Sequence, residues 1–408
     1  MSRRRRKVTR KNASAIIISL IIVFVLGIIY LVTGRDPSGI LKTADTALPE
    51  LATLVNPVPS SATAVPSNVT PQPPLAGGWW EVYFTDPINV KDPAQWENSI
   101  EGRLIEKINA AQSSIHIASF ELDLTPVAEA LIAAKQRGVD VRWVTDDEYG
   151  LESDVEPGHG QFAMLQQRGI EVRSDTRSAL MHNKFWIFDG QTLWTGSTNI
   201  TENAIFKQDN NVLVIHSPEV AAIYEREFVE MWEGQFGPKS PSQLNEQTAV
   251  VNGSQIVVVF TSEDPAIENA IIPIVRGAQS SIRFMAFSFT DFPLAQAMID
   301  RAGMGVNVAG VYEKVGSDTA ASELKTLFCG HVPVRRDGNS GFMHSKVIVV
   351  DERTVITGSL NFSTNAEESN DENVIIIDNP EIARLYMQEF ERVWNLATDP
   401  EPDKFPCT

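Results

Sequence analysis

A pattern of residues that occurs twice constrains this chain more than any other feature. The first copy consists of Met181-His182-Asn183-Lys184, Asp189 and Gly196-Ser197-Thr198-Asn199. The second consists of Met343-His344-Ser345-Lys346, Asp351 and Gly358-Ser359-Leu360-Asn361. In both copies the Lys follows the His by two residues, the Asp follows the Lys by five, and the Gly follows the Asp by seven. One such match occurs readily by chance, but two with identical spacing predict two related halves that build one active site.

The surrounding sequence repeats as well. Ala111-Gln112-Ser113-Ser114-Ile115 returns as Ala278-Gln279-Ser280-Ser281-Ile282, and Gly138-Val139-Asp140-Val141 returns as Gly305-Val306-Asn307-Val308. Helical patterns alternate with short apolar strands in both halves, including strands at 184–188 and 346–350 and a helix at 319–328. This alternation predicts an α/β fold with helices on both faces of a sheet. We expect halves at 79–236 and 255–408, joined by a linker at 237–254.

The first 78 residues differ in composition from the rest. Residues 1–14 are basic, 15–33 are almost entirely apolar, and 34–78 are rich in Pro, Ser and Thr. An apolar stretch of this length after a basic cluster favours a transmembrane anchor over a cleaved signal peptide or a buried helix, with the segment at 34–78 as a tether. The positive-inside rule then places the catalytic body on the outer side of a bacterial cell membrane, in a single-pass protein.

Charge and cysteine content narrow the chemistry. The formal net charge is -18, and the first 35 residues hold eight basic residues and no acid, which leaves -26 for the remainder. Such a body repels polyanions on average. Cys329 and Cys407 are the two cysteines, and no Cys/His cluster has zinc spacing. Two free thiols are the simpler expectation, and one disulfide is the alternative.

The repeated residues suit chemistry at a phosphate. Side chains two apart on a strand share a face, so each His projects beside its Lys. The expected phosphate ligands are Lys184, Ser197, Asn199, Lys346, Ser359 and Asn361, because ammonium, hydroxyl and amide groups bind phosphate oxygens. Two imidazoles on opposite sides of one phosphorus permit attack by one and protonation of the leaving oxygen by the other. The sequence suggests no metal and no other cofactor.

An attacking imidazole usually needs a carboxylate on its second nitrogen. A candidate acid follows each motif: Asp209 in Gln208-Asp209-Asn210 and Glu372 in Asp371-Glu372-Asn373, two segments that align as Asp-Asn over Asp-Glu. The second half therefore has an acid, Glu372, where the first half has Asn210. The first half must take its acid from Asp209 or from across the interface.

These two His-Lys-Asp motifs resemble those of the phospholipase D superfamily, and the resemblance covers nearly all of residues 79–395. It implies a duplicated fold of two mixed β-sheets flanked by helices, packed as a pseudo-twofold pair around one active site. It also implies a covalent phosphohistidine without a metal, with His182 as nucleophile and His344 as acid and base. Asp189, Gly196, Asp351 and Gly358 then shape the motif loops rather than perform chemistry.

Several functions are compatible with this site. We favour hydrolysis of phospholipid head groups by a membrane-anchored phosphodiesterase, with one chain as a monomeric catalytic unit. Ser281–Thr290 resembles small bacterial nucleases of the superfamily, so nucleic acid is the alternative substrate, although the negative body argues against it. A phosphatidyltransferase of the cardiolipin synthase type is less favoured, and a non-catalytic scaffold is least favoured.

Overall fold

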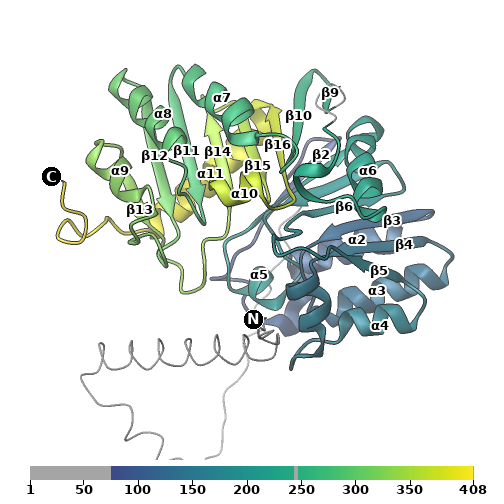
Figure 1. Ribbon diagram of the computed structural model, residues 1–408. Helices are drawn as coiled ribbons and strands as arrows, with labels where there is room; N and C mark the ends of the chain where they lie inside the picture. Colours follow the sequence, from purple (N-terminus) through teal and green to yellow (C-terminus); the bar gives the residue numbers. More distant parts are fainter. Residues whose placement is uncertain (1–74, 243–246, 408) are drawn as a thin grey trace, which may run out of the picture. The chain divides into compact units, whose positions relative to one another are not determined.

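The computed structural model describes residues 75–242 and 247–407 (Figure 1). The predicted basic tail, the anchor at 15–33 and the tether up to residue 74 lie outside this part of the chain. In the described ranges no helix has the length and apolar character needed to cross a membrane. We therefore withdraw the prediction of a single-pass location with an outward-facing body, because the described structure offers no helix that supports it.

The first half contains an eight-stranded mixed sheet with the order β1-β2-β8-β7-β6-β3-β4-β5. Neighbours from β3 to β5 are parallel, and all other neighbours are antiparallel. The strands are β1 (Leu75–Ala76), β2 (Trp80–Phe84), β3 (Ser114–Ser119), β4 (Asp140–Thr145), β5 (Glu171–Ser174), β6 (Lys184–Phe188), β7 (Thr192–Gly196) and β8 (Asn211–His216).

The second half repeats this sheet strand for strand, in the order β9-β10-β16-β15-β14-β11-β12-β13. Its parallel neighbours are again the three strands at one edge, β11 to β13. The strands are β9 (Thr248–Val251), β10 (Ser254–Thr261), β11 (Ser281–Ala286), β12 (Asn307–Tyr312), β13 (Val334–Arg336), β14 (Lys346–Val350), β15 (Thr354–Gly358) and β16 (Glu372–Asp378). The expected duplicated fold with two mixed sheets is therefore confirmed.

Helices cover both faces of each sheet. The first half contains α2 (Ile100–Ala110), α3 (Thr125–Gln136), α4 (Gln161–Gln167), α5 (Glu202–Phe206) and α6 (Pro218–Trp232). The second contains α7 (Ile272–Gly277), α8 (Phe292–Gly303), α9 (Leu324–Cys329), α10 (Thr364–Glu368) and α11 (Pro380–Leu396). Apolar residues of α2 to α4 form one core with the first sheet, and those of α7 to α9 form another with the second.

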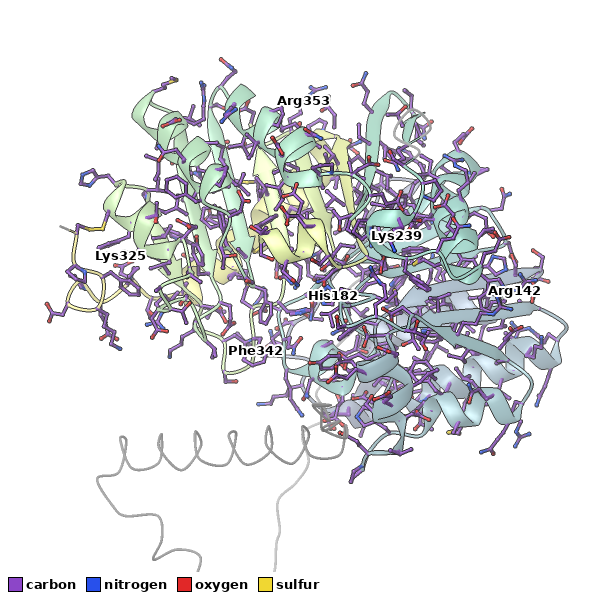
Figure 2. All side chains as sticks on the ribbon, in the orientation of Figure 1. Arg142, His182, Lys239, Lys325, Phe342 and Arg353 are labelled. Carbon is purple, nitrogen blue, oxygen red and sulfur yellow. A yellow bond between two sulfur atoms is a disulfide. The ribbon has the colours of Figure 1, made fainter. Side chains whose placement is uncertain are left out.

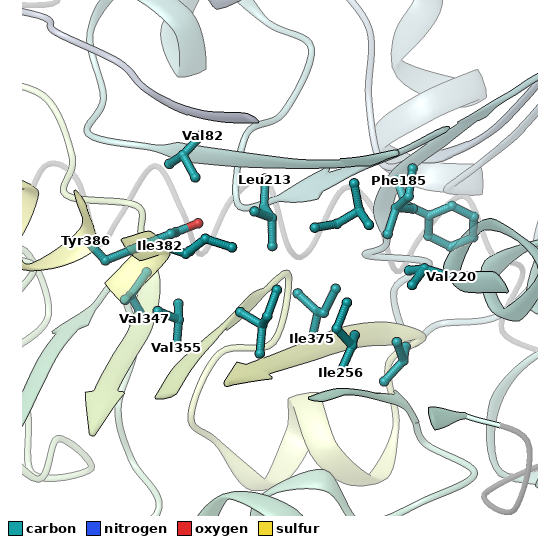
Figure 3. Packing of buried hydrophobic residues seen from close by; sticks show 14 of the residues in the cluster. Val82, Phe185, Leu213, Val220, Ile256, Val347, Val355, Ile375, Ile382 and Tyr386 are labelled. Carbon is teal, nitrogen blue, oxygen red and sulfur yellow. The ribbon is translucent and has the colours of Figure 1, made fainter. Parts of the chain in front are cut away.

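A third core joins the two halves, and α6 and α11 lie within it. Strand periodicity explains why β8 can serve two cores: Leu213 and Ile215 point into the shared core, whereas Val212 and Val214 point into the outer one. Figure 3 shows side chains of both halves meeting there, for example Leu213 and Ile375. The halves are thus held together by apolar packing around the site.

The observed elements differ from the expected ones at a few places. β6 and β14 have the predicted bounds, but the helix expected at 319–328 begins only at Leu324. β2 and β10 were not predicted, and β9 lies inside the expected linker. β9 and β10 form a hairpin whose turn residues Asn252 and Gly253 both have positive φ (47° and 84°). Asn-Gly between apolar runs is a strong hairpin signal, so this turn was visible in the sequence.

The cysteine expectation also needs correction. Cys329, at the end of α9, and Cys407 form a disulfide, so the thiols are not free. Near the disulfide, Phe405 packs against Phe328 with ring centroids 6.4 Å apart, and Phe405 is buried. This packing brings the C-terminal segment back to α9, which a reading of cysteine spacing alone could not reveal.

Candidate active site

Backbone pairing across the two halves creates the site. The His182 N–H donates to the Asp371 carbonyl (2.9 Å), and the His344 N–H donates to the Asp209 carbonyl (2.9 Å). Each motif His is thereby fixed beside the segment that leads into the last strand of the opposite half. Figure 2 shows His182 where the halves meet. The expectation that both copies serve one site follows from this exchange of hydrogen bonds.

The partner of His182 is Glu372, from the opposite half. The His182 Nδ1 lies 2.7 Å from Glu372 Oε2, and the carboxylate is fully buried. Burial lowers the pKa of His182 well below its usual value, and the ammonium groups of Lys184 and Lys346 lower it further. Burial raises the pKa of Glu372 to about 7 although Lys184 opposes this rise. A neutral imidazole that donates Nδ1–H to the carboxylate keeps its Nε2 lone pair available.

The partner of His344 is an amide. The His344 Nδ1 lies 3.0 Å from Oδ1 of Asn210, which again comes from the opposite half. The Asn210 Nδ2 donates to the Ala204 carbonyl (3.0 Å), which fixes the amide with its oxygen toward the imidazole. Burial lowers the pKa of His344 well below its usual value, followed by Lys346 and Lys184. Glu372 therefore supports His182, and among the described residues no carboxylate is hydrogen-bonded to the His344 ring.

The two lysines are buried beside the histidines. Each Nζ donates to the carbonyl of its own motif His, at 2.8 Å for Lys184 and 2.6 Å for Lys346. An ammonium group has three donors, so hydrogens remain for a phosphate. Burial lowers the pKa of Lys184 to about 8, against the opposing charges of Glu372 and Glu121, and burial also lowers that of Lys346. Bringing two cations together out of water is costly, and a bound anion would relieve that cost.

The asparagines and serines of the motifs lie in different environments. The Oδ1 atoms of Asn199 and Asn361 are buried and have no hydrogen-bond partner among the described residues. The Ser197 hydroxyl donates to Asn210 Oδ1 (2.8 Å) and accepts from the Asn211 N–H (3.1 Å). The Ser359 hydroxyl accepts from the Asn373 N–H (3.0 Å). Both hydroxyls are fully buried and engaged within the protein, where they hold the segments that carry Asn210 and Glu372.

The glycines and aspartates of the motifs shape the backbone. A Cβ on Gly196 would lie 2.3 Å from the Asn211 carbonyl oxygen, and one on Gly358 would lie 2.2 Å from that of Asn373. Only glycine permits this approach at φ of 150° and 143°. Asp189 accepts hydrogen bonds from the backbone of residues 112–114, and Asp351 does the same for residues 279–281.

The side chain of Asp209 pairs with groups other than a histidine, although its backbone carbonyl accepts from the His344 N–H. Its carboxylate contacts the Arg392 guanidinium and accepts from Asn339 Nδ2 (3.0 Å), so the orienting role expected for it is wrong in this structure. The equivalent residue in the second half, Asp371, pairs with Arg177 in the same way. Neither arginine was predicted from the sequence, because each forms its ion pair with a residue far away along the chain.

Glu121 is a further residue that the sequence reasoning missed. It accepts a hydrogen bond from Asn199 Nδ2 (2.6 Å). Burial raises its pKa to about 7, and the charge of Lys184 opposes that rise. The repeat places Ser288 at the matching position of the second half. The sequence does carry a signal for Glu121, because the repeat aligns Phe120-Glu121-Leu122 with Phe287-Ser288-Phe289 and the two halves differ at its middle position.

Comparison with known proteins agrees with this geometry. A family model described as "Cardiolipin synthase, PLD-like domain" matches residues 104–232 and 271–394, which is more than half of the chain. The chain belongs to this PLD-like family. Its enzyme class is therefore that of phosphodiesterases of the phospholipase D type, as predicted.

Individual proteins that are similar to this chain carry the names of different enzymes. The mitochondrial cardiolipin hydrolase of Xenopus tropicalis is 36% identical over 143 residues, which span 35% of this chain and 68% of that protein. The nuclease Nuc of Salmonella typhimurium is 32% identical over 36% of this chain and 99% of that one, with a TM-score of 0.35. Phosphatidylserine synthase of Haemophilus influenzae is 15% identical over 80% of this chain and 90% of that one, with a TM-score of 0.55. The last similarity supports the two-half fold alone.

Proposed function

We propose that this protein hydrolyses phospholipid head groups through a covalent intermediate on His182. The observation that carries this proposal is the unequal support of the two imidazoles. A carboxylate stabilises positive charge on the His182 ring, whereas the amide of Asn210 stabilises it less on His344. The first ring is thus suited to hold a phosphoryl group, and the second is suited to release a proton.

In the first step, His182 Nε2 attacks phosphorus and the bond from phosphorus to the leaving alcohol breaks. His344 transfers a proton from its Nε2 to the leaving oxygen, so that the alcohol departs neutral. In the second step, His344 removes a proton from water and the resulting hydroxide attacks phosphorus. The bond from phosphorus to His182 then breaks, which returns both imidazoles to their starting state.

The negative charge of a bound substrate would let His344 take up from solvent the proton that it later transfers. The pKa of His344 is low because of burial and because Lys346 and Lys184 are close. A phosphodiester monoanion bound between the lysines offsets their charge and raises the pKa of His344 toward neutrality. The same lysines, with Asn199 and Asn361, face the negative charge that grows on the non-bridging oxygens during displacement.

The choice of a lipid rests on charge and on the relative's name. Excluding the first 35 residues, the formal net charge is -26, which disfavours a long polyanion more than a single phosphodiester. A relative with 36% identity is named a cardiolipin hydrolase. Because both motifs lie in one chain, a single copy contains every residue that the mechanism uses, and we propose a monomeric catalytic unit.

In the test, the full-length protein is incubated with vesicles of phosphatidylcholine, phosphatidylglycerol or cardiolipin. A separate reaction contains single-stranded DNA. We expect head-group release from vesicles, and its loss in His182→Asn and His344→Asn. His331→Asn is the matched control, because His331 is exposed and lies outside the motifs. Cleavage of DNA without head-group release would reject the lipid assignment. In wild-type protein quenched with alkali during turnover, which preserves a phosphohistidine, we expect the phosphoryl group on residue 182, and its appearance on residue 344 would reject the assigned nucleophile.

A further inference from the structure

A group of acidic side chains lies away from the histidines, at the junction of the two halves. Glu227 and Glu230 belong to α6 of the first half, and Glu263 follows β10 of the second. One carboxylate oxygen from each lies within 4.8 Å of the other two. Glu227 and Glu230 are buried, so three carboxyl groups converge where water is scarce, and burial followed by the nearby carboxylates raises the pKa of Glu227 well above its usual value. Like charges are rarely gathered in this way without a compensating group.

Gln247 gives an independent indication of a ligand at this place. Its side chain is 2% exposed, and its Oε1 atom has no hydrogen-bond partner among the described residues. It lines the same small cavity as the three glutamates. A buried acceptor without a donor costs free energy, and a bound cation would satisfy it. Four oxygen atoms from three separate chain segments therefore face one space.

The size of the cavity suits a single ion. Its volume of about 10 Å³ matches that of one water-sized sphere. Oxygen ligands at 2.3 to 2.6 Å from a calcium ion lie at most about 5 Å apart, which agrees with the 4.8 Å limit for the carboxylates. Arg226 also lines the cavity and brings one positive charge beside the carboxyl groups. A divalent ion bound there would release the protons that burial keeps on the glutamates.

We propose that Glu227, Glu230, Glu263 and the Gln247 carboxamide bind a hard divalent cation, with Ca²⁺ as the best fit. An all-oxygen ligand set selects such ions, and Ca²⁺ tolerates irregular geometry better than Mg²⁺ does. The ion would join α6 to the segment after β10 and so clamp the two halves. It would lie apart from the histidines, and its role is structural rather than chemical.

The clamp would also steady a backbone contact of the active site. Ser240 donates to Glu230 Oε2 (3.0 Å), and nearby the Gly237 N–H donates to Asp371 Oδ1 (2.6 Å). The carbonyl of Asp371 is the acceptor for the His182 N–H. The segment from α6 through residue 240 thus connects the proposed cation site with the support of His182.

The test uses the full-length protein freed of metals, with thermal unfolding followed as CaCl2 or MgCl2 is added. At a cation concentration a hundred times the Kd, the midpoint should rise by about 4 °C for a protein of this size. Glu263→Gln should remove this response. Without metal, that variant should be at least as stable as the wild type, because one repelling charge is gone. Glu233→Gln, at the exposed end of α6, is the matched control and should respond like the wild type.

Two results would overturn the proposal. No shift in the wild type at 5 mM CaCl2 would mean that the carboxyl groups balance their charge by sharing protons instead. An undiminished shift in Glu263→Gln would place the ion elsewhere. Both readouts are independent of catalysis, so they remain interpretable if the proposed lipid hydrolysis is wrong.

Discussion

The two halves of the molecule carry the same His, Lys and Asn, yet the rings of their histidines form hydrogen bonds with different partners. His182 donates to the carboxylate of Glu372, and His344 donates to the amide of Asn210. In each case the partner comes from the opposite half. The backbone contacts that bring them together, His182 with Asp371 and His344 with Asp209, are the same length in both directions.

This difference shows how a duplicated fold can divide one reaction between two copies. Burial and the two lysines depress the pKa of both histidines, so position alone does not distinguish them. The exchange of a carboxylate for an amide does distinguish them, because only an anion strongly stabilises a cationic imidazole. Under the proposed mechanism, this exchange of partner on a matched backbone separates the nucleophile from the acid.

The largest expected effect comes from exchanging these two partners. Glu372→Gln should lower kcat by about 100-fold, since the imidazole keeps a hydrogen bond but loses its counter-charge. Combining Glu372→Asn with Asn210→Glu should restore part of the activity and transfer the phosphohistidine to His344. Mass spectrometry of quenched enzyme locates the phosphoryl group. If it stays on His182 in the double variant, the partner does not decide the nucleophile.

The pH profile should reveal the same inequality. Glu372, with its pKa raised to about 7, must lose its proton to support His182, so kcat/KM should rise as the pH increases through 7. Lys184, with its pKa lowered to about 8, must keep its proton to bind phosphate, so kcat/KM should fall above pH 8. Each limb should change tenfold per pH unit. Glu372→Gln should abolish the acid limb only, and an unchanged acid limb would assign it to another group.

Much of this arrangement could be predicted from the sequence, because it rests on local spacing. The strands that begin at Lys184 and Lys346 follow from apolar runs after each motif, and the repeat implies two equivalent sheets. The loop roles of Gly196 and Gly358 follow from their fixed distance to each strand end. Even the unpredicted β9–β10 hairpin carried a readable Asn252-Gly253 signal.

The crossed pairing could not be predicted in this way. Glu372 follows the second motif along the chain, and nothing in that order shows that it reaches the first His. The β-bridge between Met181 and Asp371, which joins segments far apart in the chain, brings the two together. The role predicted for Asp209 was wrong for the same reason. Its carboxylate forms an ion pair with Arg392 of α11, which lies more than 180 residues later in the chain.

A smaller effect, equal in both halves, is expected at the two motif aspartates. Burial alone would raise the pKa of Asp189 and of Asp351, but hydrogen bonds from backbone N–H groups outweigh it and lower both. Alanine at either position should cost about 1–2 kcal/mol of unfolding free energy, given their partial exposure to solvent. Urea unfolding at pH 7 measures both. The loss should shrink as the pH falls below 4, because protonated carboxyls no longer stabilise the folded state.

The smallest effect concerns Glu121, which has Ser288 as its counterpart. The Glu121 carboxylate lies close enough to Lys184 to raise the pKa of that lysine against the larger effect of burial. Glu121→Ser should therefore shift the alkaline limb to lower pH. It should also lower KM for an anionic substrate about threefold, because one repelling charge is removed from the phosphate site. Ser288→Ala is the matched control and should change neither quantity. A higher KM in Glu121→Ser would show instead that the carboxylate acts mainly by holding Asn199 in place, 2.6 Å away.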